Sequence, residues 1–415
     1  MEHQNVAIVL GGTNPHKALI ENLKSRGYYT ILIDYYENPP AKSVADKHIR
    51  ESTLDKEKVY ELAKKYEAKL VISTCIDQAN VTACYVAGKL NLTKPYSYEI
   101  ASEIADKTRM KQRMVNAGIP TASFILTDRL EGLDIENLNF PLVVKPSDTN
   151  GSKGVMRVDN QTELKKYLAN ALDLSRNGKA VIEEFVEGDE FGIDCFITNG
   201  IATVITTHRK RKPNKKDGSV IFSIGSISPA PISDKVKIKI GEIANKIAKE
   251  FGLENTPLLM QLIINGEEVN VVEFAPRIGG GLNFRKINMF AHFDILSASV
   301  DSFLNIPVKV DFKNIDFKYS ENHIYTQPGI FGKIVGIEDL IKDGTIKEFY
   351  INKSKGSVIE KGHASKDRIG SFIAEGKDLE EIKLRIRKVF NYIKIYDESG
   401  SEMKFESLYD DLILD

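Results

Sequence analysis

The sequence has little cysteine, almost no net charge and no long apolar run, and each absence excludes a class of protein. Its three cysteines lack the spacing of metal ligands or of paired disulfides, which predicts a protein that keeps its thiols reduced. A net charge of −1 creates no overall field that would attract nucleic acid or an acidic membrane. No apolar run approaches the roughly 20 residues of a membrane-spanning helix. A strand is expected within a few residues of Met1, so we expect no signal peptide and a cytoplasmic protein without nucleic-acid or membrane partners.

The chain has 415 residues, of which 42% are hydrophobic and 28% charged, and this is the composition of an ordinary globular protein. This length accommodates several subdomains. Changes in the residue pattern along the chain predict four regions. They are an N-terminal α/β domain (1–96), two central subdomains (97–178 and 179–310) and a C-terminal α+β cap (311–415). The first domain alternates apolar strands with helices, which predicts a doubly wound parallel sheet. Its glycine pair, Gly11-Gly12, is followed by Thr13 and His16 where a dinucleotide fingerprint has glycines, so we expect no NAD site.

The most informative stretch, residues 258–281, reads as two apolar strands joined by a short turn and interrupted by Gln261 and Glu273. A buried carboxylate costs several kcal/mol unless a cation or a donor meets it, and a bound metal ion is one such partner. The two positions are an even number of residues apart. A turn of three or five residues therefore puts both side chains on one face, whereas a two-residue turn at Asn265-Gly266 puts them on opposite faces. A metal site predicts the odd-length turn, and the alternative is a core hairpin whose glutamate is satisfied by protein groups.

Cationic and glycine-rich features precede this hairpin. Lys107 stands at the start of a predicted helix, and Lys145 ends a short buried strand, where an ammonium group is costly unless an anion compensates it. The loop 147–155 is rich in glycine and hydroxyl groups and could present donors to phosphate oxygens, although a plain hairpin turn would look similar. It does not match the P-loop pattern.

Taken in order, these features resemble the ATP-grasp superfamily, whose two α+β subdomains hold ATP between them. The resemblance covers roughly residues 100–305. It implies that Lys107 and Lys145 contact the nucleotide phosphates and that the loop around Ser152 and Gly154 covers them. It also assigns nucleotide binding to the end of an acidic strand, formed by Glu183, Glu184, Phe185 and Val186. The carboxylate of Glu190, farther along the chain, would bind the ribose. The backbone of residues 184–186 would be the hinge that reads adenine.

The same resemblance assigns the metal positions to Gln261 and Glu273, for Mg²⁺ or Mn²⁺, and a phosphate-binding role to Arg277. Two departures bear on the metal. Many members have Glu at the position of Gln261, although carbamoyl-phosphate synthetases resemble this chain in using Gln, and Ala275 replaces the usual Asn. Glu273 is left as the only charged ligand. Mg²⁺ is held largely by phosphates and waters with one or two carboxylates, so the site can still work, with the number of ions left open.

The implied function is an ATP-dependent carboxylate–amine ligase, similar to the L-amino-acid (dipeptide) ligases and to single halves of carbamoyl-phosphate synthetase. ATP would convert a carboxylate to an acyl phosphate, which an amine displaces, with ADP and phosphate released. Lys145, Arg277 and Arg285 are the expected catalytic groups, the two arginines lying at the carboxylate-binding end of the acceptor site. The partners would be small-molecule acids and amines, and the family implies a homodimer. Alternatives are a purine- or cell-envelope-pathway ligase, or a nucleotide-binding protein whose altered metal site no longer supports turnover.

One basic run remains, over residues 208–218, and it lacks the interleaved aromatics of a nucleic-acid surface. It is interpreted either as a solvated hairpin tip or as a mobile loop that closes over ATP or an acidic substrate. His292 is expected to be a packed core histidine rather than a catalytic base. In the cap, an amphipathic pattern predicts a helix over 377–392.

Overall fold

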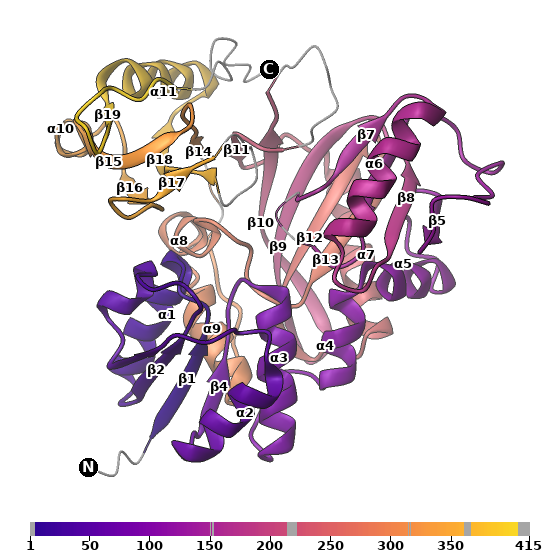
Figure 1. Cartoon of the computed structure of the whole chain (residues 1–415), viewed down its shortest axis with the longest axis horizontal. Helices are drawn as coiled ribbons and strands as arrows, with labels where there is room; N and C mark the ends of the chain where they lie inside the picture. The colour runs from indigo at the N-terminus through magenta and orange to yellow at the C-terminus, as the bar shows by residue number, and fades with distance from the viewer. Residues whose placement is uncertain are drawn as a thin grey trace.

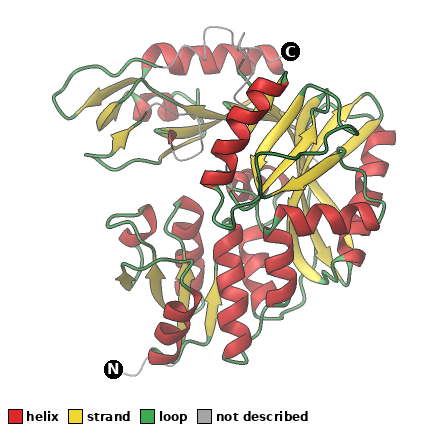
Figure 2. Cartoon of the chain, turned by 45° about the vertical axis from the view of Figure 1, so that its right-hand side comes forward, coloured by secondary structure: helices red, strands yellow, loops and turns green. Residues whose placement is uncertain are grey.

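The N-terminal domain is built on a parallel sheet in a computed structural model that describes residues 5–149, 151, 153–213, 222–313, 315, 317–360 and 367–405. The sheet has the order β3-β2-β1-β4, and its strands are β1 (Val6–Leu10), β2 (Tyr29–Ile33), β3 (Lys47–Ile49) and β4 (Leu70–Ile72). Every residue of β1 is buried, as expected of a parallel strand that is covered on both faces. The helices around it are α1 (Asn14–Ser25), α2 (Lys56–Lys65) and α3 (Asp77–Lys89), with a short 3₁₀ turn at Pro40–Ser43 (Figure 2).

Two helices lead from this domain into a small antiparallel sheet. They are α4 (Tyr98–Ala105) and α5 (Lys107–Asn116), and the sheet order is β5-β8-β6-β7. The strands are β5 (Phe124–Thr127), β6 (Leu142–Pro146), β7 (Met156–Val158) and β8 (Ala180–Glu184). Helix α6 (Gln161–Leu174) covers one face, burying Leu164 and Leu168 against the apolar residues of β6 and β8.

The largest element is an eight-stranded sheet with the order β13-β12-β9-β10-β11-β14-β18-β16. Its first five strands in the chain are β9 (Asp189–Thr198), β10 (Ile201–Arg211), β11 (Gly225–Ser228), β12 (Asn255–Asn265) and β13 (Glu268–Ala275). The remaining strands are β14 (Lys318–Ile324), β16 (Glu348–Ile351) and β18 (Gly370–Gly376). The sheet therefore runs continuously from the central region into the C-terminal region (Figure 1).

Helices pack around this large sheet and a second small sheet completes the C-terminal region. The helices are α7 (Asp234–Glu250), α8 (Asn283–Lys286), a π-helical turn (Ile287–Ala291), α9 (Ile295–Phe303), α10 (Ile337–Lys342) and α11 (Leu379–Tyr392). The second sheet has the order β17-β15-β19, from Val358–Ile359, Gly329–Val335 and Lys394–Asp397. Helix α11 confirms the predicted amphipathic helix, with Ile382, Ile386 and Val389 buried on one stripe.

This architecture confirms the predicted fold class, a parallel N-terminal sheet followed by antiparallel sheets in an α+β arrangement. Within the described residues, no helix combines the length and the apolar composition that crossing a membrane requires.

Candidate functional site

Gln261 and Glu273 lie directly opposite each other on β12 and β13. The amide nitrogen of Gln261 donates a hydrogen bond to Glu273 Oε1 at 3.0 Å. The turn between the strands has two residues, Gly266 and Glu267, because Asn265 pairs with Glu268. The predicted odd-length turn is therefore wrong, although the two side chains do share one face.

A β-bulge explains how they share it. Leu262 pairs with Val271 while Gln261 pairs with Glu273, so Val272 is an extra residue in β13. With a two-residue turn and no bulge, Glu273 would point to the face opposite Gln261. The bulge shifts the alternation of β13 by one residue and so returns Glu273 to the face of Gln261. Val272 is an ordinary strand residue, which is why the pattern of apolar residues did not reveal the bulge.

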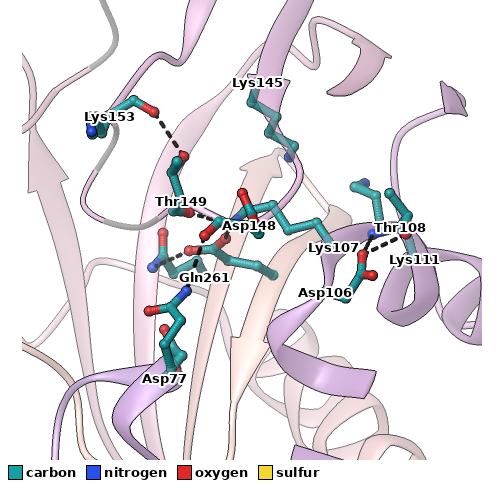
Figure 3. A network of polar contacts seen from close by, with 12 residues as sticks. Asp77, Asp106, Lys107, Thr108, Lys111, Lys145, Asp148, Thr149, Lys153 and Gln261 are labelled. Carbon is teal, nitrogen blue, oxygen red and sulfur yellow. Dashed lines mark hydrogen bonds and ion pairs between the residues drawn. The ribbon is translucent and has the colours of Figure 1, made fainter. Parts of the chain in front are cut away.

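Lys107 joins this pair from the first turn of α5, where the Asp106 side chain caps the helix. Its ammonium nitrogen donates to the carbonyl oxygen of Thr149 at 2.6 Å and lies 3.5 Å from Glu273 Oε2. Figure 3 shows Lys107, Thr149 and Gln261 close together although they come from different elements. A pocket is lined here by Lys107, Gln261 and Glu273, together with Asp77, Ile104, Ala105, Met110, Leu259, Phe274, Ala275 and Arg277.

A buried lysine–glutamate–lysine triad lies beside the pocket. Lys145 Nζ donates to Glu183 Oε1 at 2.5 Å, and Lys111 Nζ lies 2.8 Å from Glu183 Oε2. Burial alone would raise the pKa of Glu183, but the two lysines outweigh it and hold that pKa at about 2. Burial also lowers the pKa of Lys111, on which Glu183, Lys145 and Glu273 all act electrostatically. The triad carries two cations against one anion, an excess suited to a phosphate group.

Lys111 was missed by the sequence reasoning. It follows Lys107 by four residues, so the two lysines lie on one face of α5. That spacing is the signal that could have identified it. Glu183, expected to contact the nucleotide, instead uses its side chain to hold Lys111 and Lys145.

The expected phosphate loop follows β6. Gly154 has φ +76, and a Cβ there would lie 2.8 Å from Leu174 Cδ1 and 3.0 Å from Pro146 Cγ, so a side chain would be strained. Thr149 Oγ1 donates to the carbonyl oxygen of Lys153 at 2.9 Å, which closes the loop on itself. Ser152 lies outside the described residues.

The hinge segment leaves the end of β8. The N–H groups of Glu184 and Phe185 donate to the carbonyl oxygens of Ser123 and Pro141, both at 3.0 Å. The Arg157 guanidinium lies over the Phe185 ring, 4.5 Å from its centroid. These two N–H groups are therefore already used, so the predicted reading of an adenine edge by residues 184–186 would depend on other backbone groups of the segment.

Glu190 lies on β9 and is paired with Lys210 of β10 and with Lys212, which directly follows that strand. Lys210 Nζ contacts its Oε1, and Lys212 Nζ lies 3.0 Å from its Oε2. Burial would raise the pKa of Glu190, but Lys210 and Lys212 outweigh it and hold the pKa at about 2. Lys210 also donates to Gln261 Oε1 at 3.0 Å. The first residues of the basic run thus belong to the site, while residues 214–218 of that run lie outside the described residues.

The two predicted catalytic arginines do not lie together. Arg277 makes a two-point ion pair with Asp77, with Nε–Oδ1 at 2.6 Å and Nη2–Oδ2 at 2.8 Å. Asp77, the first residue of α3, was also missed, although the ends of parallel strands are where ligands commonly bind. Arg285 instead pairs with Glu348 of β16, with Nε–Oε2 at 3.0 Å.

His292 contradicts its sequence-based interpretation. Its side chain is exposed and its backbone is left-handed, with φ 55, at the end of the π-helical turn. The prediction of a core histidine is therefore wrong, because the position ends a helix instead of lying on its buried stripe.

Comparison with known proteins agrees with this geometry. Residues 138–285 match the family model described as ATP-grasp domain, and residues 322–398 match L-amino acid ligase C-terminal domain 2. The chain is 24% identical over 308 residues to the L-arginine-specific L-amino acid ligase of Bacillus subtilis, covering 72% of this chain and 70% of that protein. A crystal structure of an L-amino acid ligase from Bacillus licheniformis superposes with a TM-score of 0.79 at 19% identity, covering 96% of this chain and all of that one.

Relatives of other activities are also similar. The formate-dependent phosphoribosylglycinamide formyltransferase of Methanococcus vannielii is 24% identical over 410 residues, covering 94% of this chain and 96% of that protein. A carbamoyl phosphate synthase large chain from Clostridium acetobutylicum is 26% identical over 268 residues, or 61% of this chain, and the chain spans only 24% of that protein's length. The chain therefore contains an ATP-grasp domain over residues 138–285 and an L-amino acid ligase C-terminal domain over residues 322–398, and its ligase homologues support an ATP-dependent carboxylate–amine ligase.

Proposed function

We propose that the protein uses ATP and Mg²⁺ to convert a carboxylate into an acyl phosphate and joins it to an amine, with amino acids as substrates. The observation that carries the proposal is the convergence of Lys107, Gln261, Glu273 and Arg277 on one pocket, beside the Lys111–Glu183–Lys145 triad. These residues come from both central subdomains, which is the arrangement that holds a nucleotide between two sheets. The C-terminal domain shared with L-amino acid ligases supports amino-acid substrates.

The cations of the site suit phosphoryl transfer. This reaction needs little covalent help and depends on positioning and on cancelling charge around the transferred group. Lys107, Lys111 and Lys145 are buried in the structure and therefore act in a low dielectric, where fixed charges are most effective. In our proposal Lys107 and Lys145 contact the phosphates, and Lys111 fixes the position of Lys145 through their shared carboxylate.

The donor set fits a divalent cation. Glu273 offers carboxylate oxygens and Gln261 an amide oxygen, which are the ligand types that Mg²⁺ and Mn²⁺ accept. When bound, the ion would neutralise charge on the phosphate oxygens. Glu273 would hold it, and Lys107, now 3.5 Å away, would turn toward the phosphates.

Arg277 is proposed to bind the reacting carboxylate and its phosphate. Its planar guanidinium already makes a two-point contact with the Asp77 carboxylate, which has the geometry that a substrate carboxylate would require. A substrate would therefore take the place of Asp77 on Arg277. Exchange of one carboxylate for another keeps the half-buried guanidinium paired throughout.

The test is release of ADP and phosphate with a panel of amino acids supplied singly and in pairs. We expect release that needs both an acid and an amine and that Glu273→Ala abolishes. Tight ATP binding without release under any pairing would instead favour a nucleotide-binding protein that has lost turnover.

A purine-pathway ligase is the second candidate, because the Methanococcus vannielii formyltransferase aligns with nearly the whole chain. The same assay separates the two. Release with formate and phosphoribosylglycinamide, but not with amino acids, would replace the amino-acid proposal.

A further inference from the structure

Lys210 occupies an unusual place in the site. It extends from β10 on the same sheet face as Gln261, because His208 pairs with Gly192 and Gly192 pairs with Gln261. Its ammonium group contacts Glu190 Oε1 and donates to Gln261 Oε1 at 3.0 Å. A protein cation therefore sits at one of the two positions that a metal ion would use.

The orientation of the Gln261 amide follows from this contact. An ammonium group can only donate, so Gln261 must turn its oxygen to Lys210 and its NH₂ group to Glu273. Glu273 in turn faces Lys107. Donors and acceptors thus alternate along the row Lys210, Gln261, Glu273 and Lys107. Position 261 needs an amide, because an amide can accept from Lys210 with its oxygen and donate to Glu273 with its nitrogen.

The same contacts reduce what is left for metal ions. The Gln261 oxygen is engaged by Lys210, and Glu190 is balanced by Lys210 and Lys212. Ala275, at the end of β13, offers no side-chain ligand. Among the residues that the structure describes, no group of three or more His, Cys, Asp or Glu side chains is placed to hold a metal ion. Glu273 remains as the anionic ligand.

We propose that the ammonium group of Lys210 takes the place of a second metal ion. The site then binds one divalent cation per nucleotide, and Glu273 holds it. The inference rests on the proposed function, since it assigns the nucleotide to this pocket. An ammonium within hydrogen-bond distance of Gln261 repels a divalent ion from that amide oxygen. It also provides donors to phosphate oxygens that need no free metal to be present.

The direct test counts ions in the wild-type protein. Mn²⁺ is titrated against the protein saturated with the non-hydrolysable ATP analogue AMP-PNP, and free Mn²⁺ is measured by electron paramagnetic resonance. We expect one protein-dependent Mn²⁺ per bound nucleotide. Two ions per nucleotide in the wild type would overturn the proposal, and this measurement does not depend on any variant folding.

Variants test the role of Lys210 itself. Lys210→Met keeps the apolar stem and removes the charge, and should weaken AMP-PNP binding about tenfold at limiting Mn²⁺. The double variant Lys210→Met with Gln261→Glu should bind a second Mn²⁺. A count that stays at one in the double variant, with nucleotide bound and the thermal midpoint near that of the wild type, would show that Lys210 does not exclude the second ion.

Two controls make the comparison specific. Lys212→Met removes the other partner of Glu190, with no contact to Gln261 among the described interactions, and should leave the ion count at one. Lys235→Gln breaks an exposed pair with Glu267 at the far end of the hairpin and should change neither count nor affinity. Binding of AMP-PNP with two ions defeats only the Lys210 inference, whereas failure to bind any nucleotide defeats it together with the proposed function.

Discussion

Glu183 holds two ammonium groups, Lys111 and Lys145, in a place where each would be costly alone. All three residues are at most 6% exposed. A buried ion pair adds little stability compared with apolar residues, but removing one member leaves the others uncompensated. The triad thus keeps two cations in a buried site, and its glutamate is proposed to act on the nucleotide through the lysines that it positions.

Glu183→Gln should lower the free energy of unfolding at pH 7 by about 3 kcal/mol, because two buried like charges lose their shared counter-ion. Denaturant unfolding of the variant and the wild type measures the difference. Glu184→Gln is the matched control, since Glu184 is adjacent and accepts only from Asn139 in the described contacts. Equal losses in both variants would contradict a special role for the triad.

Acid should weaken the wild type through the same carboxyl group. The pKa of Glu183 is about 2 in the folded protein, below its ordinary value of 4.5, so the folded state binds fewer protons than the unfolded state between these values. Its contribution is fully present above pH 4.5 and is lost as the pH falls toward 2. The free energy of unfolding should therefore fall less steeply with decreasing pH over this window in Glu183→Gln than in the wild type. Parallel curves would show that Glu183 is not the titrating group.

At the scale of elements, the β12–β13 hairpin determines whether the two proposed metal ligands, Gln261 and Glu273, lie on the same face of the sheet. Its bulge and its two-residue turn act together, since either alone would separate Gln261 from Glu273. Strand alternation keeps Val269 and Val271 buried on the opposite face, against the core below the sheet.

Deletion of Val272 should be tolerated, because Glu273 would then pair with Gln261 in a regular ladder and Val271 would still pair with Leu262. We expect a change of at most about 1 kcal/mol in the free energy of unfolding and retained Mg²⁺–AMP-PNP binding. Deletion of Val269 is the control, since it also shortens the strand by one residue but removes one buried valine and reverses the face of the other, Val271. A folded Val272 deletion that no longer binds nucleotide would show that the bulge does more than set the register.

Much of this hairpin, and less of its surroundings, could be predicted from the sequence. The order of Lys107, Lys145, Gln261 and Glu273 along the chain resembles the ATP-grasp pattern, and that resemblance predicted one site for them. Asp77 and Lys210 could not be placed, since their partners lie 200 and 51 residues away along the chain and depend on how domains and strands pack. Local patterns report periodicity and turns, and they contain no information about such long-range pairs.

At the scale of the whole molecule, the N-terminal domain contributes to the pocket through one ion pair. Asp77 of α3 holds Arg277, which follows β13, while Arg26, at the C-cap of α1, pairs with Asp301 of α9 at 2.6 Å on another part of the same interface. The first contact lines the pocket and the second does not. Docking of the domain therefore sets the position of the arginine that is proposed to meet the substrate.

Arg277→Ala should lower turnover about 100-fold while changing ATP affinity less than about threefold, because the guanidinium is proposed to act on charge that develops during transfer. Steady-state kinetics and AMP-PNP titration provide the two numbers. Arg26→Ala should lower the thermal midpoint without this split between turnover and affinity. A loss confined to ATP affinity in Arg277→Ala would place the arginine on the nucleotide alone.

The continuous eight-stranded sheet has a consequence for how new substrate preferences could be engineered. Because β14 from the C-terminal region pairs with β11 from the central region, the two regions share backbone hydrogen bonds across residue 310. A chimera that exchanges everything after that residue would have to rebuild a strand–strand seam, and a truncation there would expose the edge of β11 to pairing with other molecules. Recombination with related ligases should therefore exchange β11 and β14 as one unit.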